Sequence, residues 1–223
     1  MRTGGVHIDS EGVWCEVRDG AARSGPALFL DRDGVVVEET DYLSRAEDVA
    51  ILPGAADVIA AANRRGVPVV LVTNQSGIGR GYFGWSEFAA VQHAIASTLE
   101  AQGARLDAVY ACPHHESGRG AFAVAHHPAR KPNPGMLLRA AADLDLNLRK
   151  SWMVGDKTID IEAAKRAGLA GAVHVLTGYG EAERAKSEPL AAPDFELRFG
   201  RSITDALALP ILTPTNECFA SQQ

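Results

Sequence analysis

Short apolar runs alternate with amphipathic stretches along the 223 residues of this chain. Runs rich in Val, Ile and Leu that end in turn residues predict buried strands, and they lie at residues 27–30, 69–72, 106–111, 152–154 and 172–176. Apolar positions spaced by three or four residues predict helices, and these patterns lie at 54–65, 85–102, 136–144 and 158–167. Strands that alternate with helices indicate an α/β fold with a central parallel sheet and right-handed crossovers.

The two ends of the chain fall outside this alternation. Residues 1–26 precede the first core strand, and the alternating Val13, Cys15 and Val17 predict an edge strand at 12–18. The weaker pattern beyond residue 177 predicts a polar loop at 178–193 with a helical turn at 181–186, a strand at 194–199 and a helix at 203–209. We therefore expect an N-terminal extension (1–26), one domain (27–212), and a tail that is disordered or loosely docked (213–223).

Composition and charge narrow the classes of protein. The formal net charge of −6 disfavours non-specific binding to nucleic acid or to an anionic membrane. No apolar run approaches the length of a membrane span, and residues 1–10 lack the apolar core of a secretory signal. The three cysteines, Cys15, Cys112 and Cys218, lie too far apart to suggest a disulfide framework. We expect a cytoplasmic enzyme that is a monomer or a weak homo-oligomer.

Two carboxylates follow the first predicted strand in the segment Asp31-Arg32-Asp33-Gly34. Carboxylates at the carboxyl end of such a strand lie where open α/β sheets bind their ligands. One of them can act as a nucleophile beside a cation while the other handles a proton. The alternative is a pair of solvated aspartates in a turn.

Three later segments add groups suited to phosphate chemistry. Thr73 and Asn74 end the second strand, where hydroxyl and amide groups can hold a phosphoryl group or simply cap a turn. Arg130 and Lys131 precede a Pro-rich turn and are either phosphate-binding cations or an ordinary surface pair. Asp156 follows the strand at 152–154 and can complete a carboxylate set for Mg²⁺ or cap the next helix.

The order of these motifs resembles the haloacid dehalogenase (HAD) superfamily of phosphohydrolases over roughly residues 27–177. The closer similarity is to phosphatases of D-glycero-D-manno-heptose 1,7-bisphosphate and to histidinol-phosphate phosphatases. Its marks are the segments 31–34, 73–82, 112–115, 130–136 and 155–157. The resemblance implies a three-layer Rossmann-like HAD fold with a short flap at 34–53 and no large cap domain.

The resemblance also implies a mechanism. Asp31 attacks the phosphorus and forms an aspartyl-phosphate, and Asp33 protonates the leaving oxygen and then activates water. Mg²⁺ is bound by Asp31, Asp156 and the backbone carbonyl of Asp33. Phosphate oxygens are held by Thr73, Asn74 and Lys131, with Arg130 and Lys157 as additional contacts.

One loop departs from the family pattern. Related heptose-bisphosphate phosphatases carry a zinc loop of the form Cys-x-His, a spacer, and Cys-x-Cys just before Arg-Lys-Pro. Here Cys112 and His114 match the first pair, but His127 and Ala129 stand in the places of the second. Structural zinc usually has four protein ligands. Two outcomes are open: Zn²⁺ bound by Cys112, His114, His127 and a neighbour, or a polar loop without metal.

The expected function is Mg²⁺-dependent hydrolysis of a small phosphorylated metabolite, and the resemblance favours the 7-phosphate of the heptose 1,7-bisphosphate. Histidinol phosphate or another small phosphomonoester is the alternative, and the loop at 112–130 is expected to choose between them. A phosphatase of nucleic-acid ends would need a basic groove, which the acidic balance disfavours. A catalytically silent binding protein is disfavoured by the intact set Asp31, Asp33, Lys131 and Asp156.

Overall fold

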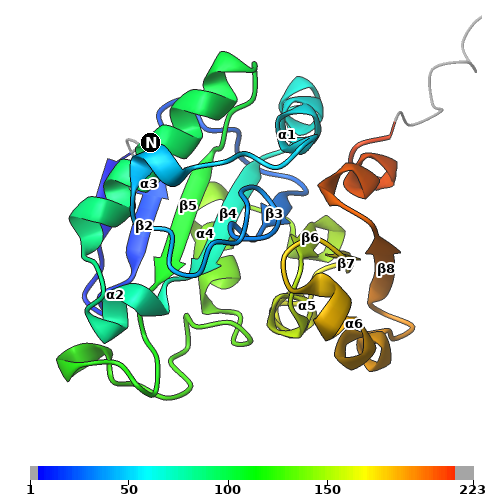
Figure 1. Ribbon diagram of the computed structural model, residues 1–223. Coiled ribbons are helices and arrows are strands. Elements are labelled where there is room, and N and C mark those ends of the chain that lie inside the picture. The colour runs from blue at the N-terminus through cyan, green and yellow to red at the C-terminus, as the bar shows by residue number, and fades with distance from the viewer. Residues whose placement is uncertain (1–4, 214–223) are drawn as a thin grey trace, which may run out of the picture.

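Eight strands form one sheet in the computed structural model, which describes residues 5–213 (Figure 1). The strands are β1 Gly5–Ile8, β2 Trp14–Val17, β3 Leu28–Leu30, β4 Val69–Asn74, β5 Ala108–Cys112, β6 Trp152–Gly155, β7 Gly171–Val175 and β8 Glu196–Gly200. They lie in the order β1-β2-β5-β4-β3-β6-β7-β8. In the part of the sheet that runs β5-β4-β3-β6-β7-β8, every pair of neighbouring strands is parallel. At the other end β2 is antiparallel to β5, and β1 is antiparallel to β2. The predicted central parallel sheet is confirmed.

Helices cover both faces of the sheet and complete a three-layer α/β fold. The α-helices are α1 Ala55–Arg64, α2 Ser76–Arg80, α3 Trp85–Ala101, α4 Gly135–Leu144, α5 Thr158–Arg166 and α6 Gly180–Ser187. One hydrophobic cluster joins α1 and α3 to one face of the sheet, and a second joins α4 and α5 to the opposite face. The four helices predicted from apolar spacing all form, within one residue of their expected bounds.

Every side chain of the central strand β3 is apolar because helices cover both faces of the sheet there. Leu28 and Leu30 belong to the cluster under α1 and α3, whereas Phe29 belongs to the cluster under α4 and α5. All three side chains are fully buried, as expected for a parallel strand that is covered on both faces. This packing fixes the end of β3, and therefore the position of Asp31, which follows it.

The chain reverses its direction across the sheet at β3. It runs outward from β3 to β4 and β5, and later returns to β6 on the other side of β3. Leu30 pairs with Leu71 on β4 and with Val154 on β6, so three strand ends meet at one edge. Open α/β sheets bind their ligands at such a switch point.

The N-terminal extension forms a β-hairpin that widens the sheet. The predicted strand at 12–18 forms as β2, but it is not the edge, because β1 pairs outside it. Trp14 at the start of β2 pairs with Ala111 near the end of β5. The turn of the hairpin therefore lies beyond the carboxyl end of β5, at the same edge of the sheet as Asp31. Figure 1 shows the hairpin and β8 at opposite ends of the sheet.

A short flap, and no large cap domain, follows β3. Residues 33–53 contain one 3₁₀ turn, η1 Ala46–Asp48. The Val35–Val37 stretch at the base of the flap is fully buried, and Val37 bridges both Asp33 and Ile51. The flap is thus anchored by its apolar base while its tip reaches the edge of the sheet where the strands end.

The C-terminal part differs from its prediction in detail. The turn expected at 181–186 is the helix α6, and the helix expected at 203–209 is a 3₁₀ helix, η5 Ile203–Ala208. The tail predicted at 213–223 lies outside the described residues apart from Thr213. Within residues 5–213, no helix is both long enough and apolar enough to cross a membrane.

Candidate active site

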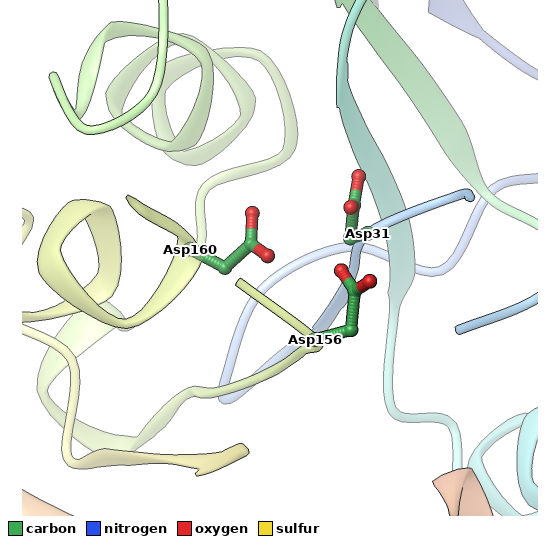
Figure 2. Close-up of side chains that lie close together, drawn as sticks. All are labelled: Asp31, Asp156 and Asp160. Carbon is green, nitrogen blue, oxygen red and sulfur yellow. The ribbon is translucent and has the colours of Figure 1, made fainter. Parts of the chain in front are cut away.

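Three buried aspartates converge at the switch point (Figure 2). Asp31 follows β3, Asp156 follows β6, and Asp160 lies in the first turn of α5. One ligand oxygen from each lies within 4.8 Å of the other two, and across residues 5–213 they are the only His, Cys, Asp or Glu side chains that form such a group. Three carboxylates this close repel one another unless cations join them. Asp31 is buried, so it is not one of a pair of solvated turn aspartates, whereas Asp33 is only partly buried.

One cation is already part of the cluster. The Nζ atom of Lys131 lies 2.8 Å from Asp31 Oδ1 and 2.6 Å from Asp160 Oδ1, and it donates to the Val72 carbonyl oxygen at 2.8 Å. Burial alone would lower the pKa of Lys131, but Asp160 and Asp31 outweigh it and hold the pKa above its ordinary value. Lys131 is therefore a buried ammonium ion beside the strand end and not a surface residue.

Asp156 is a buried carboxyl group with one oxygen left unpaired. Its Oδ2 accepts the Tyr179 N–H at 2.8 Å, while Oδ1 is buried without a hydrogen-bond partner among the described residues. Burial, followed by repulsion from Asp31 and Asp160, raises the pKa of Asp156 to about 8. A hard divalent cation bound by oxygen ligands would relieve both the repulsion and the missing contact. The donor set therefore fits Mg²⁺.

The backbone around Asp156 is packed too closely for side chains. A Cβ at Gly34 would lie 2.5 Å from Asp156 Oδ2, and one at Gly178 would lie 2.3 Å from the same atom. Both glycines also have positive φ angles, which glycine adopts without strain. Asp156 does not cap α5, because Asp160 Oδ2 accepts the Lys157 N–H there at 3.0 Å.

Asp33 lies outside the aspartate cluster and has its own partners. Arg32 Nε donates to both carboxylate oxygens of Asp33 at 3.1 Å, and Gln75 Nε2 donates to Oδ2 at 3.1 Å. The guanidinium of Arg32 is buried and lies over the Phe88 ring, 5.5 Å from its centroid. Asp33 is thus held near the surface of the site by two donors that the sequence did not single out.

The residues after β4 form a short polar network. Gln75 Nε2 also donates to Thr73 Oγ1 at 2.8 Å, which leaves the hydroxyl proton of Thr73 free to donate. Asn74 uses both polar side-chain atoms on the backbone of Lys131: Nδ2 donates to its carbonyl and Oδ1 accepts its N–H, each at 3.0 Å. Asn74 therefore fixes the segment that carries Lys131.

A pocket of about 170 Å³ opens beside this network. Its wall includes Asp33 and Gln75 on the sheet side, together with flap residues and the loop after β7. Lys157 lies in this wall, 3.1 Å from Glu39 Oε2 on the flap and 4.1 Å from the ring centroid of Tyr179. Burial alone would lower the pKa of Lys157, but Asp156, Asp31 and Glu39 raise it above its ordinary value.

More positive charge lies next to the pocket. Arg80 contacts the hydroxyl of Tyr42, a pocket residue, and its Nη2 lies 3.1 Å from Nε2 of His115. Burial, and to a smaller degree the charge of Arg80, lowers the pKa of Arg130. Burial and the charges of Arg130 and Arg80 likewise lower the pKa of His115. The two arginines Arg80 and Arg130, which we call the rim cations, therefore form a group that an anion would stabilise, and the neutral His115 ring lies beside them.

The three candidate zinc ligands do not form a metal-binding group in this structure. Cys112 Sγ lies 4.0 Å from His127 Nδ1, but Cys112, His114 and His127 do not bring three ligand atoms together within 4.8 Å of one another. His127 Nδ1 already accepts the Ala129 N–H at 3.1 Å, and the Ala129 side chain offers no ligand. These positions do not fit a tetrahedral zinc ion.

Four residues of the site were missed from the sequence: Arg32, Gln75, Asp160 and Tyr179. The first three lie inside or beside recognised motifs, so their positions carried a signal that was not used. Tyr179 lies two residues beyond the part of the chain covered by the resemblance, and nothing in its surroundings marks it.

The amino-acid sequence is similar to a known family of phosphatases. A family model described as HAD-hydrolase-like matches residues 128–198. The D-glycero-beta-D-manno-heptose-1,7-bisphosphate 7-phosphatase of Mesorhizobium japonicum is 51% identical over 172 residues, which are 76% of this chain and 79% of that protein. The D-glycero-D-manno-heptose-1,7-bisphosphate 7-phosphatase of Thermosynechococcus vestitus is 44% identical over 161 residues, 70% of this chain and 81% of that protein.

Solved structures agree with these relatives. A Mesorhizobium loti protein assigned by similarity as a HAD-like phosphatase superposes with a TM-score of 0.82 at 43% identity, and the match covers 94% of this chain and 99% of that one. The D,D-heptose 1,7-bisphosphate phosphatase of B. bronchiseptica, complexed with magnesium and phosphate, superposes with a TM-score of 0.70 at 31% identity, over 80% of this chain and 94% of that one.

Proposed function

This chain belongs to the HAD-like phosphatase family that includes the heptose-1,7-bisphosphate 7-phosphatases, and we propose that it hydrolyses the 7-phosphate of D-glycero-D-manno-heptose 1,7-bisphosphate. The observation that carries the proposal is the buried cluster of Asp31, Asp156 and Asp160 around Lys131. It lies at the sheet edge where α/β proteins bind ligands, and it combines a nucleophile with cations for phosphate.

Asp31 is the proposed nucleophile. Lys131 binds its Oδ1 at 2.8 Å, which fixes the carboxylate and leaves Oδ2 to attack the phosphorus. The new bond joins Asp31 to the phosphoryl group as the bond to the sugar oxygen breaks, and water then attacks the phosphorus and releases phosphate. The carboxylate is restored at the end of the cycle.

Asp33 is the proposed acid and base. It protonates the leaving sugar oxygen in the first step and takes a proton from water in the second. Its carboxylate is bonded to Arg32 and Gln75 in the structure, so proton transfer requires it to turn from these donors toward the leaving oxygen. Both donors lie at the pocket, where they can receive the carboxylate again after the step.

Asp31, Asp156 and the backbone carbonyl of Asp33 would hold Mg²⁺, for which the unpartnered Oδ1 of Asp156 provides a ligand. When bound, the ion supplies positive charge that offsets the repulsion between Asp31 and phosphate. The Thr73 hydroxyl donates to a phosphate oxygen, and the Lys131 ammonium, whose N–H groups are used by Asp31, Asp160 and the Val72 carbonyl, contributes positive charge to the phosphate site. Asn74 positions Lys131 through its backbone.

The rim cations favour a substrate with a second phosphate. Arg80 contacts the pocket residue Tyr42, and Arg130 is close enough to Arg80 for their charges to interact, so the two arginines can bind an anionic group at the far end of a sugar. Because a charge-assisted bond to a guanidinium is stronger than a neutral one, this group supplies preference for a bisphosphate.

One observation supports a second candidate, histidinol phosphate. The acidic flap residues Glu39 and Asp41 line the pocket, and carboxylates there suit a substrate that carries an amino group. Glu39 is already paired with Lys157 at 3.1 Å, and Asp41 accepts the Tyr179 hydroxyl at 2.9 Å. We therefore rank histidinol phosphate below the bisphosphate.

Phosphate release from a panel of substrates tests the proposal. The panel holds both anomers of the heptose 1,7-bisphosphate, histidinol phosphate, hexose 6-phosphates and nucleotides, each with Mg²⁺ and with EDTA. We expect kcat/KM for the bisphosphate to exceed that for every other ester by about 100-fold or more, and EDTA to abolish it. An equal or higher kcat/KM for histidinol phosphate would show that the bisphosphate is not the preferred substrate. Full activity in EDTA would show that the reaction does not require Mg²⁺.

A further inference from the structure

The N-terminal hairpin contacts the loop for which zinc binding was one of two open outcomes. We call residues 113–130 the histidine loop; it starts where β5 ends. Since Trp14 pairs with Ala111, the hairpin turn at 9–13 projects past the end of β5 toward this loop. The turn is well built: Asp9 Oδ1 accepts the N–H groups of both Glu11 and Val13 at 2.9 Å.

Two contacts join the turn to the histidine loop. His114 is almost completely buried, and its Nε2–H donates to the Glu11 carbonyl oxygen at 2.7 Å. Gly12 packs against Phe122 so closely that a Cβ at Gly12 would lie 2.8 Å from Cε1 of the ring. Gly12 also has a φ of +79°, so both its conformation and its neighbour favour glycine.

Two of the four histidines of the loop, His114 and His127, are oriented toward the hairpin. The rings of His114 and His127 are stacked, with centroids 3.7 Å apart and an interplanar angle of 3°. Because His127 Nδ1 accepts the Ala129 N–H, its proton is on Nε2, which lies 3.8 Å from the Glu11 carboxylate. Each ring therefore presents an N–H to Glu11, one to the backbone and one toward the side chain.

His114 also connects the hairpin turn to the active site. The carbonyl oxygen of His114 accepts a hydrogen bond from Arg130 Nη1 at 2.9 Å. Arg130 precedes Lys131, which binds Asp31. A chain of direct contacts thus runs from Glu11 through His114 to a rim cation.

We propose that the hairpin turn does in this chain what a metal ion would do: it fastens the histidine loop through Glu11 and Gly12 and so holds Arg130 in place. The ligand atoms of Cys112, His114 and His127 do not converge, and Ala129 offers none. His114 uses Nε2 for the hairpin, and its Nδ1 is buried without a partner among the described residues. A role of Arg130 in substrate binding follows only from the proposed function, and the expected effect of the hairpin on KM rests on that function.

The first experiment displaces the turn and uses a matched glycine as control. Gly12→Ala introduces a Cβ that must move Phe122, whereas Gly103→Ala carries the same positive-φ cost with nothing within 4 Å of the new Cβ. We expect Gly12→Ala to raise hydrogen–deuterium exchange in residues 113–130 and to raise KM for the bisphosphate about tenfold, with kcat and the KM for a monophosphate ester within about twofold of wild type. Gly103→Ala should change none of these.

The second experiment tests which nitrogen of His114 matters. A glutamine amide can replace the Nε2–H donor, and an asparagine amide replaces the Nδ1 position instead. We expect His114→Gln to retain the wild-type KM and loop exchange, and His114→Asn to behave like Gly12→Ala. If His114 were a metal ligand through Nδ1, the glutamine variant would lose its function as well.

The zinc content of the protein distinguishes a histidine loop that is held by the hairpin turn from one that is held by a metal ion. Protein purified without a histidine tag should contain zinc far below one atom per chain, and a chelator should not alter exchange in residues 113–130. About one zinc per chain that is lost in His114→Gln would overturn the proposal, as would unchanged exchange in Gly12→Ala. Hydrogen–deuterium exchange and zinc content do not depend on turnover. They therefore test the contact between the hairpin turn and the histidine loop even if the bisphosphate proves not to be the substrate.

Discussion

The ammonium group of Lys131 lies 2.8 Å from Oδ1 of Asp31, and both side chains are buried. The same ammonium is 2.6 Å from Asp160, so one cation serves two carboxylates. This contact fixes one oxygen of the proposed nucleophile and puts a positive charge beside it. It also makes the stability of the site depend on charge balance, because an unpaired charge in the interior is costly.

Replacing Lys131 with methionine is expected to affect both activity and folding. We expect kcat/KM to fall about 100- to 1,000-fold, since the positive charge at the phosphate site and the contact that holds Asp31 are lost. The free energy of unfolding should fall by about 3–5 kcal/mol, because Asp31 and Asp160 are left without their cation. Lys150→Met, at an exposed position, is the matched control for denaturant unfolding and kinetics. Unfolding of Lys131→Met at the wild-type midpoint would contradict the charge balance described here.

Mg²⁺ binding is expected to depend on pH through Asp156. Its pKa is raised to about 8, so below that pH a proton occupies the carboxyl group and must leave before a cation binds. The apparent dissociation constant for Mg²⁺ should therefore fall about tenfold per pH unit between about pH 6 and pH 8 and level off above. Calorimetry in buffers of different ionisation enthalpy measures the released proton. Asp156→Asn, which cannot titrate, should bind Mg²⁺ weakly with no such slope, and a slope that persists would assign the proton elsewhere.

Arg130 should distinguish a bisphosphate from a monophosphate. If it binds the second phosphate, Arg130→Gln raises KM for the heptose bisphosphate about 10- to 100-fold and leaves kcat nearly unchanged, because the contact is equal in ground and transition states. Activity on a hexose 6-phosphate should stay within about twofold. Arg149→Gln, on the exposed 3₁₀ turn before β6, is the control. Equal losses on both substrates would move Arg130 from substrate selection to the reacting phosphate.

Stability should fall in mild acid because of His174. This buried ring donates from Nε2 to the Gly180 carbonyl at 2.8 Å and accepts from Ser187 Oγ at 3.0 Å through Nδ1. Burial lowers the pKa of His174. The unfolded chain binds a proton below about pH 6.5 and the folded chain does not, so the free energy of unfolding falls as the pH drops through that value.

His174→Gln isolates this contribution. The variant should be less stable than wild type at pH 7.5 but lose less stability between pH 7.5 and pH 5. His93→Gln, at an exposed position of α3, should follow the wild-type curve in thermal unfolding. An acid slope in His174→Gln as steep as that of wild type would show that other groups control it.

The sequence sufficed where the site follows from strand ends. Asp31 and Asp156 each come directly after an apolar strand, and parallel strands bring such ends to one edge. Asp160 could not be assigned in this way, because an aspartate in the first turn of a helix usually caps it. It reaches the cluster only because Gly155 lets α5 approach β6: a Cβ at Gly155 would lie 2.3 Å from Cβ of Asp160.

The hairpin illustrates what local pattern cannot predict. The alternation of Val13, Cys15 and Val17 indicated a strand, but its partner β5 lies about 90 residues away, and only that pairing brings Glu11 to His114. The adjacent Arg130 and Lys131 likewise have different fates. Lys131 is buried against Asp31, while Arg130 reaches back to the histidine loop, and these directions are set by packing across the sheet edge.

Transfer of the 7-phosphoryl group of a heptose bisphosphate to Asp31 is the reaction that we propose for this site. Rapid acid quench of the enzyme with substrate carrying radioactive phosphate at position 7 or at position 1, followed by peptide mapping, would detect it. The 7-labelled substrate should place covalent label on the peptide containing Asp31, and neither the 1-labelled substrate nor Asp31→Asn should give any. Label on another residue, label from position 1, or turnover with no labelled protein at any quench time would contradict the account.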